Sequence, residues 1–167
     1  GLSADADYRA VSVHPASGSF RFEVEHRGAL VGPLELPLRG IHNVVNAAGV
    51  VAMATDFGVP FAAIASALGR FGGVARRFDV RGVDGGATFV DDYAHHPTEV
   101  AATLSAARRG PWRRVWAVFQ PHLFSRTLAL HDQFGAAFPL ADRVVVTDVF
   151  PARETPIPGV TGELVAA

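Results

Sequence analysis

The sequence contains no cysteine and no lysine among its 167 residues. Without cysteine the chain can form neither a disulfide nor a thiol nucleophile, and cysteine usage gives no sign of secretion. All fifteen basic residues are arginine, so the chain holds neither a P-loop lysine nor a Schiff-base lysine. Any phosphate or carboxylate bound here must be held by arginine, histidine or backbone amides.

The sequence also lacks an excess of one charge and a long hydrophobic run. Its net charge of −1 argues against nucleic acid or an anionic membrane as the main partner. The longest apolar stretch, Val44 to Ala54, is too short to span a bilayer, and no signal peptide follows Gly1. With 49% hydrophobic residues the chain can bury a core, so we expect a folded cytoplasmic protein. The sequence leaves its oligomeric state open.

The two ends predict a piece of a longer protein. The first residue is Gly1 rather than methionine. Near the other end Thr161 can cap a helix whose first turn holds Glu163, so a helix is expected to begin where the sequence stops.

Residues 1–77 and 78–167 show different patterns, and we place a domain boundary between them. Residues 8–38 alternate apolar and polar side chains, as antiparallel half-buried strands do. A helix over residues 43–56 is apolar nearly all round and is expected to be buried, and a second helix covers residues 60–68. The glycine-rich, basic stretch 69–77 is the predicted connector.

The second part alternates strands and helices. Asp84-Gly85-Gly86 predicts a hairpin between strands 78–83 and 87–92. A helix at 98–109, a strand at 115–119, a helix near 127–138 and a strand at 144–149 follow. This order predicts an α/β domain with right-handed crossovers and a mostly parallel sheet.

Polar side chains follow three of these strands, where ligands bind in open α/β sheets. Loops are polar in any case, but three strand ends in register favour one shared rim. The polar residues are Asp91, Asp92, Tyr93, His95 and His96 after the first strand, Gln120, His122, Ser125 and Arg126 after the second, and Asp148, Arg153 and Glu154 after the third.

The pair His95-His96 is open to three interpretations. A metal site is disfavoured, because zinc needs three or four suitably spaced ligands and cysteine is absent, so no metal ligand is predicted. A structural histidine that binds backbone at the start of helix 98–109 is one alternative. We favour an imidazole that donates to a substrate anion, helped by the positive end of that helix.

Arg126 and two asparagines are further candidates. Arginine at a helix start is unfavourable to the helix dipole, so Arg126 suggests an anion that its guanidinium would hold; a solvated surface arginine is the alternative. Asn43 and Asn46 share a helix face and could read a purine edge, although Asn43 could instead cap the helix. Arg76 and Arg77 could reach a phosphate or could be ordinary exposed charges.

Five segments, taken together and in this order, resemble the Mur ligase family. The match covers nearly the whole chain from Gly40 and residues 1–39 more loosely; the third and fourth segments are specific, whereas the asparagine pair is shared among the family. The segments are Gly40-x-His42-Asn43-x-x-Asn46-Ala47, Phe71-x-Gly73-Val74-x-Arg76-Arg77-Phe78, Asp91-Asp92-Tyr93-Ala94-His95-His96-Pro97-Thr98-Glu99, Phe119-Gln120-Pro121-His122-x-x-Ser125-Arg126-Thr127 and Asp148-Val149-x-x-Ala152-Arg153-Glu154.

The resemblance implies that residues 1–77 end a central ATP-binding domain and that residues 78–167 form much of a Rossmann-like C-terminal ligase domain. It implies ligation of L-alanine to UDP-N-acetylmuramate through an acyl phosphate, with ATP and Mg²⁺ as cofactors. The main magnesium ligands, the P-loop and the UDP-binding domain would lie upstream, so this chain alone is expected to be inactive. Some members have arginine where Leu123 stands, so the carboxylate clamp here is expected to use one arginine.

The resemblance also assigns roles to residues. Arg77, His95 and Arg126 are the implied catalytic residues. By position, His42, Asn43 and Asn46 resemble adenine contacts, Arg77 the arginine at the terminal phosphate, Asp92 the ribose-binding aspartate, and Tyr93, His95 and Arg126 the cluster that holds the amino acid carboxylate. Three alternatives stay open: the related ligase that attaches a recycled tripeptide to the same acceptor, a non-catalytic ligase-like binding module, and a metal-dependent hydrolase using Asp91, Asp92, His95 and His96.

Overall fold

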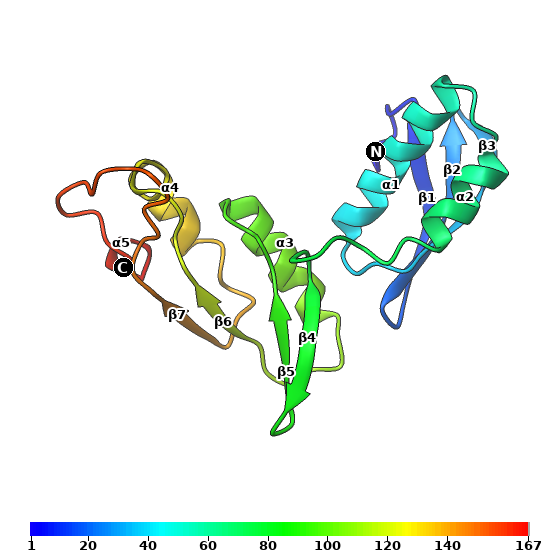
Figure 1. The fold of residues 1–167 in the computed structure, drawn as a ribbon. Coiled ribbons are helices and arrows are strands. Elements are labelled where there is room, and N and C mark those ends of the chain that lie inside the picture. The colour runs from blue at the N-terminus through cyan, green and yellow to red at the C-terminus, as the bar shows by residue number, and fades with distance from the viewer. Residues whose placement is uncertain (167) are drawn as a thin grey trace. The chain divides into compact units, whose positions relative to one another are not determined.

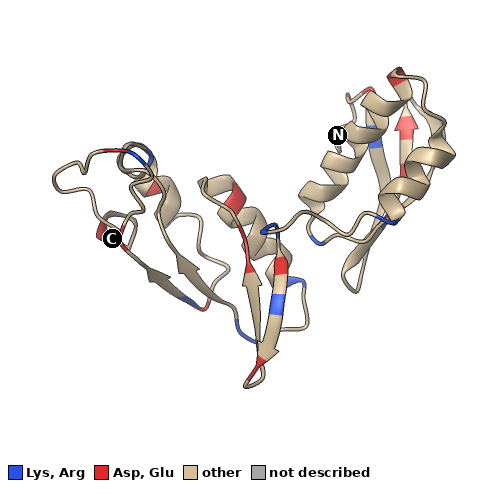
Figure 2. Ribbon diagram, viewed as in Figure 1, with Lys and Arg blue, Asp and Glu red and all other residues tan. Residues whose placement is uncertain are grey.

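A computed structural model describes residues 1–166 of the chain (Figure 1). The chain forms two compact units, Gly1–Asp79 and Val80–Ala167. Each unit has its own cluster of buried apolar side chains, so each is described separately. Acidic and basic residues occur in both units (Figure 2), in keeping with the net charge of −1.

The first unit begins with a three-stranded antiparallel sheet of β1 (Tyr8–Ala16), β2 (Ser19–His26) and β3 (Ala29–Leu36), in that order. Phe20, Phe22 and Val24 of β2 are buried while Arg21 between them is exposed. The predicted antiparallel strands are therefore confirmed, with the side-chain alternation that predicted them.

Helices α1 (Ile41–Asp56) and α2 (Phe61–Gly69) pack against this sheet. The ring of Phe61 lies against Gly32 of β3, where any side chain would collide with it. The core of the unit joins residues of the three strands and both helices: Ala10, Phe20, Phe22, Val24, Leu34, Leu36, Val44, Ala47, Ala48, Val51, Ile64 and Leu68.

Helix α1 buries one face, not its whole circumference. Val44 and Val51 are fully buried, whereas Val45 is 38% and Met53 60% exposed. The prediction of a fully buried helix was wrong, because an apolar sequence all round does not say how many sides have a partner. Within the first unit α1 contacts the sheet and α2.

The second unit holds a strand pair β4 (Asp79–Asp84) and β5 (Ala87–Asp91), and a parallel pair β6 (Trp116–Phe119) and β7 (Arg143–Val146). The predicted turn joins β4 to β5, with Gly85 and Gly86 both at positive φ (54° and 79°). Three helices complete the unit, α3 (Pro97–Arg108), α4 (Phe124–Gly135) and α5 (Glu163–Ala166). The α/β class is confirmed.

Within residues 1–166 the parallel ladder comprises β6 and β7, and β5 is hydrogen-bonded to β4 but not to β6. A side chain links β5 to the segment before β6 instead, because the Trp112 indole donates to the Thr88 hydroxyl at 2.8 Å. The core lies under β6, where Phe119 contacts Phe134 and Phe138 with ring centroids 5.0 and 5.4 Å apart.

Helix α4 begins at Phe124, three residues earlier than predicted. The cause is Leu123, which precedes the helix at φ 75° and donates its N–H to the carbonyl of Phe150 at 2.9 Å. That contact comes from a residue distant in sequence, so local pattern did not reveal it. No helix among the described residues is both long and apolar enough to cross a membrane.

Candidate functional site

Tyr93 and His95 lie together in the loop between β5 and α3. Their ring centroids are 5.2 Å apart in an edge-on arrangement, and the His95 Nδ1 lies 2.9 Å from the Tyr93 carbonyl oxygen. The backbone N–H of His95 donates to the Glu99 carboxylate at 2.9 Å. The His95 Nδ1 also lies 3.5 Å from the same Glu99 carboxylate, so the loop holds the imidazole by its Nδ1 atom.

His122 connects this loop to Arg126. It follows β6, and its ring centroid is 6.2 Å from that of His95. Arg126, in the first turn of α4, places its Nη1 atom 3.3 Å from the His122 Nδ1. The structure thus brings Tyr93, His95 and Arg126 into one neighbourhood, with His122 between the two loops.

The loop after β7 contributes by fixing the start of α4. The Glu154 carboxylate accepts the backbone N–H of Ser125 at 2.9 Å and also the Ser125 hydroxyl. These hydrogen bonds hold the pKa of Glu154 below its ordinary value. The anion that the helix dipole favours at this end is therefore supplied by the chain itself. The group that an external carboxylate would bind here is therefore the Arg126 guanidinium and not the helix end.

Two other residues of the segment after β5 have local structural roles. The His96 Nδ1 accepts the Thr98 N–H at 3.4 Å, and Glu99 accepts the His96 N–H at 3.1 Å, which forms a reciprocal cap on α3. Asp92 accepts the Ala94 N–H at 2.8 Å. The contacts of His96 favour the structural interpretation of that histidine, and leave His95 as the candidate for ligand binding.

Replacing His96 by alanine is expected to destabilise the protein by about 0.5–2 kcal/mol, because the N-cap of α3 loses its acceptor. His96→Asn keeps a capping acceptor and serves as the matched control. Urea unfolding followed by circular dichroism measures both. Equal stability of His96→Ala and the wild type would contradict the capping role.

In the first unit, Asn43 and Asn46 lie next to each other at the start of α1. Asn43 donates its Nδ2 to the Arg39 carbonyl at 2.8 Å, and Asn46 donates to the Asn43 Oδ1 at 3.4 Å. The N-cap is Gly40 and no side chain caps the helix, so the alternative of a capping Asn43 is wrong. Asn46 keeps an amide oxygen and a second N–H for a ligand.

His42 and Arg77 belong to the same unit. The His42 ring folds back over Gly40, where a side chain would collide with it. Arg77 is exposed and donates its backbone N–H to Val74 in a turn, beside Arg76 at φ 60°. Arg77 is the last residue of the stretch 69–77, which the sequence predicted to be a connector.

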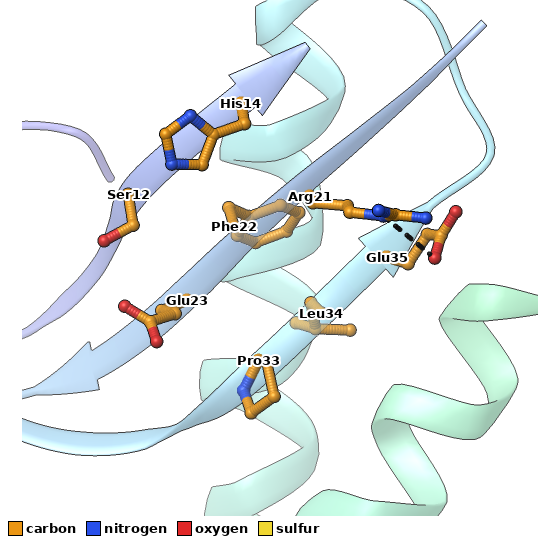
Figure 3. A pocket seen from close by; sticks show the side chains of 8 residues that line it. All are labelled: Ser12, His14, Arg21, Phe22, Glu23, Pro33, Leu34 and Glu35. Atoms are coloured by element: carbon orange, nitrogen blue, oxygen red, sulfur yellow. Dashed lines mark hydrogen bonds and ion pairs between the residues drawn. The ribbon is translucent and has the colours of Figure 1, made fainter. Parts of the chain in front are cut away.

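A shallow cavity of about 490 Å³ lies on the first unit's sheet (Figure 3). Arg21 and Glu35 pair within it at 3.3 Å, and none of the predicted site residues lines it. Within residues 1–166 no group of three or more histidine, cysteine or acidic side chains could hold a metal.

The five sequence segments belong to a chain that matches a known family. The model of the Mur ligase, glutamate ligase domain matches residues 76–167, which include Tyr93, His95 and Arg126. The chain belongs to the Mur ligase family. The resemblance of the five sequence segments to that family is confirmed.

Two curated relatives of this Mur ligase chain share a name. It is 45% identical over 167 residues to the UDP-N-acetylmuramate–L-alanine ligase of Geotalea uraniireducens, covering 100% of the chain and 36% of that protein. It is 48% identical over 163 residues to the ligase of the same name from Salinibacter ruber, covering 97% of the chain and 34% of the relative. The chain therefore spans about a third of the length of these relatives.

Solved Mur ligases share the fold. The UDP-N-acetylmuramate-alanine ligase of Thermotoga maritima superposes with a TM-score of 0.79 at 29% identity, covering 98% of this chain and 35% of that one. A murein peptide ligase from Psychrobacter arcticus gives a TM-score of 0.63 at 27% identity, covering 97% and 33%.

The site of this Mur ligase chain includes residues that the sequence did not single out. His122 and Glu154 were noted only as polar residues after strands, yet His122 contacts Arg126 and Glu154 binds Ser125. The four-residue spacing of His122 and Arg126 gave no helical signal, because His122 precedes the start of α4 at Phe124. Nothing local connects Glu154 to Ser125, which is 29 residues away.

Proposed function

We propose that this chain is part of an ATP-dependent ligase that joins L-alanine to the lactyl carboxylate of UDP-N-acetylmuramate, in the cytoplasmic synthesis of peptidoglycan precursors. The observation that carries the proposal is the neighbourhood of Tyr93, His95, His122 and Arg126. Family membership and relatives named for this reaction support it.

The cluster suits the carboxylate of a small amino acid. A guanidinium binds a carboxylate through two parallel hydrogen bonds. Arg126 contacts His122 through Nη1, and a guanidinium has five N–H donors, so others are left for a ligand. The imidazole of His95 lies 6.2 Å from that of His122, centroid to centroid, and Tyr93, beside His95, is 46% exposed. We assign the alanine carboxylate to Arg126, with His95 and Tyr93 as the neighbouring side chains.

The start of α1 suits an adenine ring. The half-buried Asn43 is held by Arg39 and by Asn46, so the amide pair is ordered before a ligand arrives. Asn46 offers both a donor and an acceptor, which is what the edge of adenine requires. We assign the base to His42, Asn43 and Asn46, the ribose to Asp92 and the terminal phosphate to Arg77.

The ligation has two steps, and the residues act on both by positioning the substrates and by neutralising charge. The lactyl carboxylate takes the terminal phosphoryl group and ADP leaves; the alanine amine then attacks the acyl carbon, and phosphate leaves. Arg126 would hold alanine with its amine toward that carbon, and Arg77 would neutralise charge on the phosphoryl oxygens. Mg²⁺ would neutralise phosphate charge when bound, and its main ligands are expected in the upstream part of the enzyme.

The tripeptide ligase is the second candidate of the same class. Two observations favour alanine over the tripeptide as the substrate. The curated relatives are named as alanine ligases, and the solved alanine ligase gives a higher TM-score than the murein peptide ligase, 0.79 against 0.63. The full-length ligase should release ADP in proportion to added L-alanine in the presence of UDP-N-acetylmuramate. Release that depends on the tripeptide and not on alanine would transfer the proposal to that enzyme, and no ligation with either would favour a non-catalytic module.

Asn43→Ala in the full-length ligase is expected to weaken ATP binding roughly tenfold, because one buried hydrogen-bond partner contributes about 1–1.5 kcal/mol. The KM for alanine should stay within about twofold of the wild type, because Asn43 is assigned to the adenine ring and not to the amino acid. Titration with a non-hydrolysable ATP analogue and alanine kinetics measure the two. An unchanged ATP affinity would remove Asn43 from the adenine site.

A further inference from the structure

The contact between His122 and Arg126 fixes the state of the imidazole. Arg126 Nη1 lies 3.3 Å from His122 Nδ1, and a guanidinium has donors only. The Nδ1 atom must therefore accept, which requires a neutral imidazole with its proton on Nε2. Protonation of Nδ1 would remove the acceptor and place a second positive charge beside Arg126.

The His122 ring is held from the loop after β7. It stacks on Phe150 with centroids 5.7 Å apart and planes 25° from parallel. The backbones of the two residues form a parallel bridge, in which Phe150 donates to the Pro121 carbonyl at 2.8 Å and accepts from Leu123 at 2.9 Å. The imidazole thus has a fixed support, which a residue that orients another side chain needs.

The groups around His122 favour its neutral form. Burial lowers the pKa of His122 below its ordinary value, and electrostatic interactions with Arg126 on α4 and with His95 before α3 lower it further. Glu154, in the loop after β7, acts in the opposite direction. Phe150 from the same loop is apolar. Because the pKa is lowered, the acceptor persists to a more acidic pH than the roughly 6.5 of an ordinary histidine.

We propose that His122 is a positioning residue that holds the Arg126 guanidinium in place for the carboxylate of the amino acid substrate. The inference rests on the proposed function, because that function places the carboxylate on Arg126. His122 acts through Arg126, so its removal affects the binding of the amino acid and leaves the chemical steps little changed.

Asparagine and glutamine variants separate the role of Nδ1 from a general need for a ring. Asparagine carries its side-chain oxygen on Cγ, the atom that bears Nδ1, whereas glutamine carries it one bond further out. In the full-length ligase, His122→Ala and His122→Gln should raise the KM for alanine about tenfold with kcat within about twofold. His122→Asn should stay within about threefold of the wild-type KM, because its oxygen replaces the acceptor.

The pH profile gives a second readout. As the pH falls through the lowered pKa of His122, the wild-type KM for alanine should rise, while His122→Asn, which cannot titrate, should show a smaller rise. His131→Asn is the control, since His131 lies on α4 and pairs with Asp132. Nitrogen NMR of the histidines, assigned with His122→Asn, should show His122 with an unprotonated Nδ1 at neutral pH.

Two results would overturn the inference while the proposed function stands: His122→Asn as impaired as His122→Gln in an active ligase, or an Nδ1-protonated His122 at neutral pH. A wild-type ligase that releases no alanine-dependent ADP would instead overturn the proposed function, and with it the carboxylate that Arg126 is positioned to bind.

Discussion

Replacing Arg126 by alanine should raise the KM of the full-length ligase for L-alanine roughly 30- to 4,000-fold, which corresponds to about 2–5 kcal/mol for removing one partner of a desolvated charge pair. The reason is geometric as well as electrostatic. His122 holds the guanidinium at 3.3 Å, so the donors that remain are already directed before alanine binds. Such pre-organisation is lost completely when the side chain is removed.

Arg126→Lys refines that test. Lysine keeps the charge but not the planar fork, so it should recover only part of the alanine affinity. Arg143→Ala, at an exposed arginine of β7, should leave the alanine KM unchanged. Initial rates of ADP release against alanine concentration measure all three variants. If Arg126→Ala has the same KM for alanine as the wild type, Arg126 does not bind the alanine carboxylate.

Phe134→Ala should lower the free energy of unfolding of the second unit by about 3–5 kcal/mol. Phe134 is 1% exposed and its ring contacts Phe119 of β6, so truncation leaves a cavity under the parallel strands. Both tryptophans, Trp112 and Trp116, lie in the second unit. Tryptophan fluorescence in a urea titration therefore reports that unit without a signal from the first.

Leu128→Ala on the same helix is the matched control for Phe134. Leu128 is 48% exposed, so its truncation should change the stability by about 0.5 kcal/mol or less. Comparable losses for the two variants would mean that α4 does not use Phe134 to pack against the strands.

The strands of the first unit were predictable because their signal is local. Phe20, Phe22 and Val24 alternate with charged residues, and one buried sheet face follows directly from that pattern. The hairpin at Gly85 and Gly86 was predictable for the same reason, since the turn requires positive φ at both positions.

The residues that arrange the candidate site were not predictable in the same way. Leu123 adopts φ 75° because Phe150 accepts its N–H, and α4 begins where it does as a result. Glu154 reaches Ser125 across 29 residues of sequence. Motif reasoning named Tyr93, His95 and Arg126 but not the contacts that orient them, because those contacts are tertiary.

A local pattern was misinterpreted at helix α1. The helix was predicted to be buried because its sequence is apolar nearly all round, but hydrophobicity does not show how many faces of a helix have a partner, and Met53 is 60% exposed. At the start of α4, Glu154 supplies an anion that the helix dipole favours. The external carboxylate on Arg126 is a further ligand and stays a prediction.

The bridge between His122 and Phe150 has a consequence for protein engineering. The two loops that follow β6 and β7 share backbone hydrogen bonds and a ring stack, so they form a single structural part. A designer who wishes to alter which amino acid is accepted should transplant both loops together from one donor enzyme. Exchanging one loop alone would combine loops whose contacts do not match, and would change the position of Arg126, which lies on α4 outside both loops.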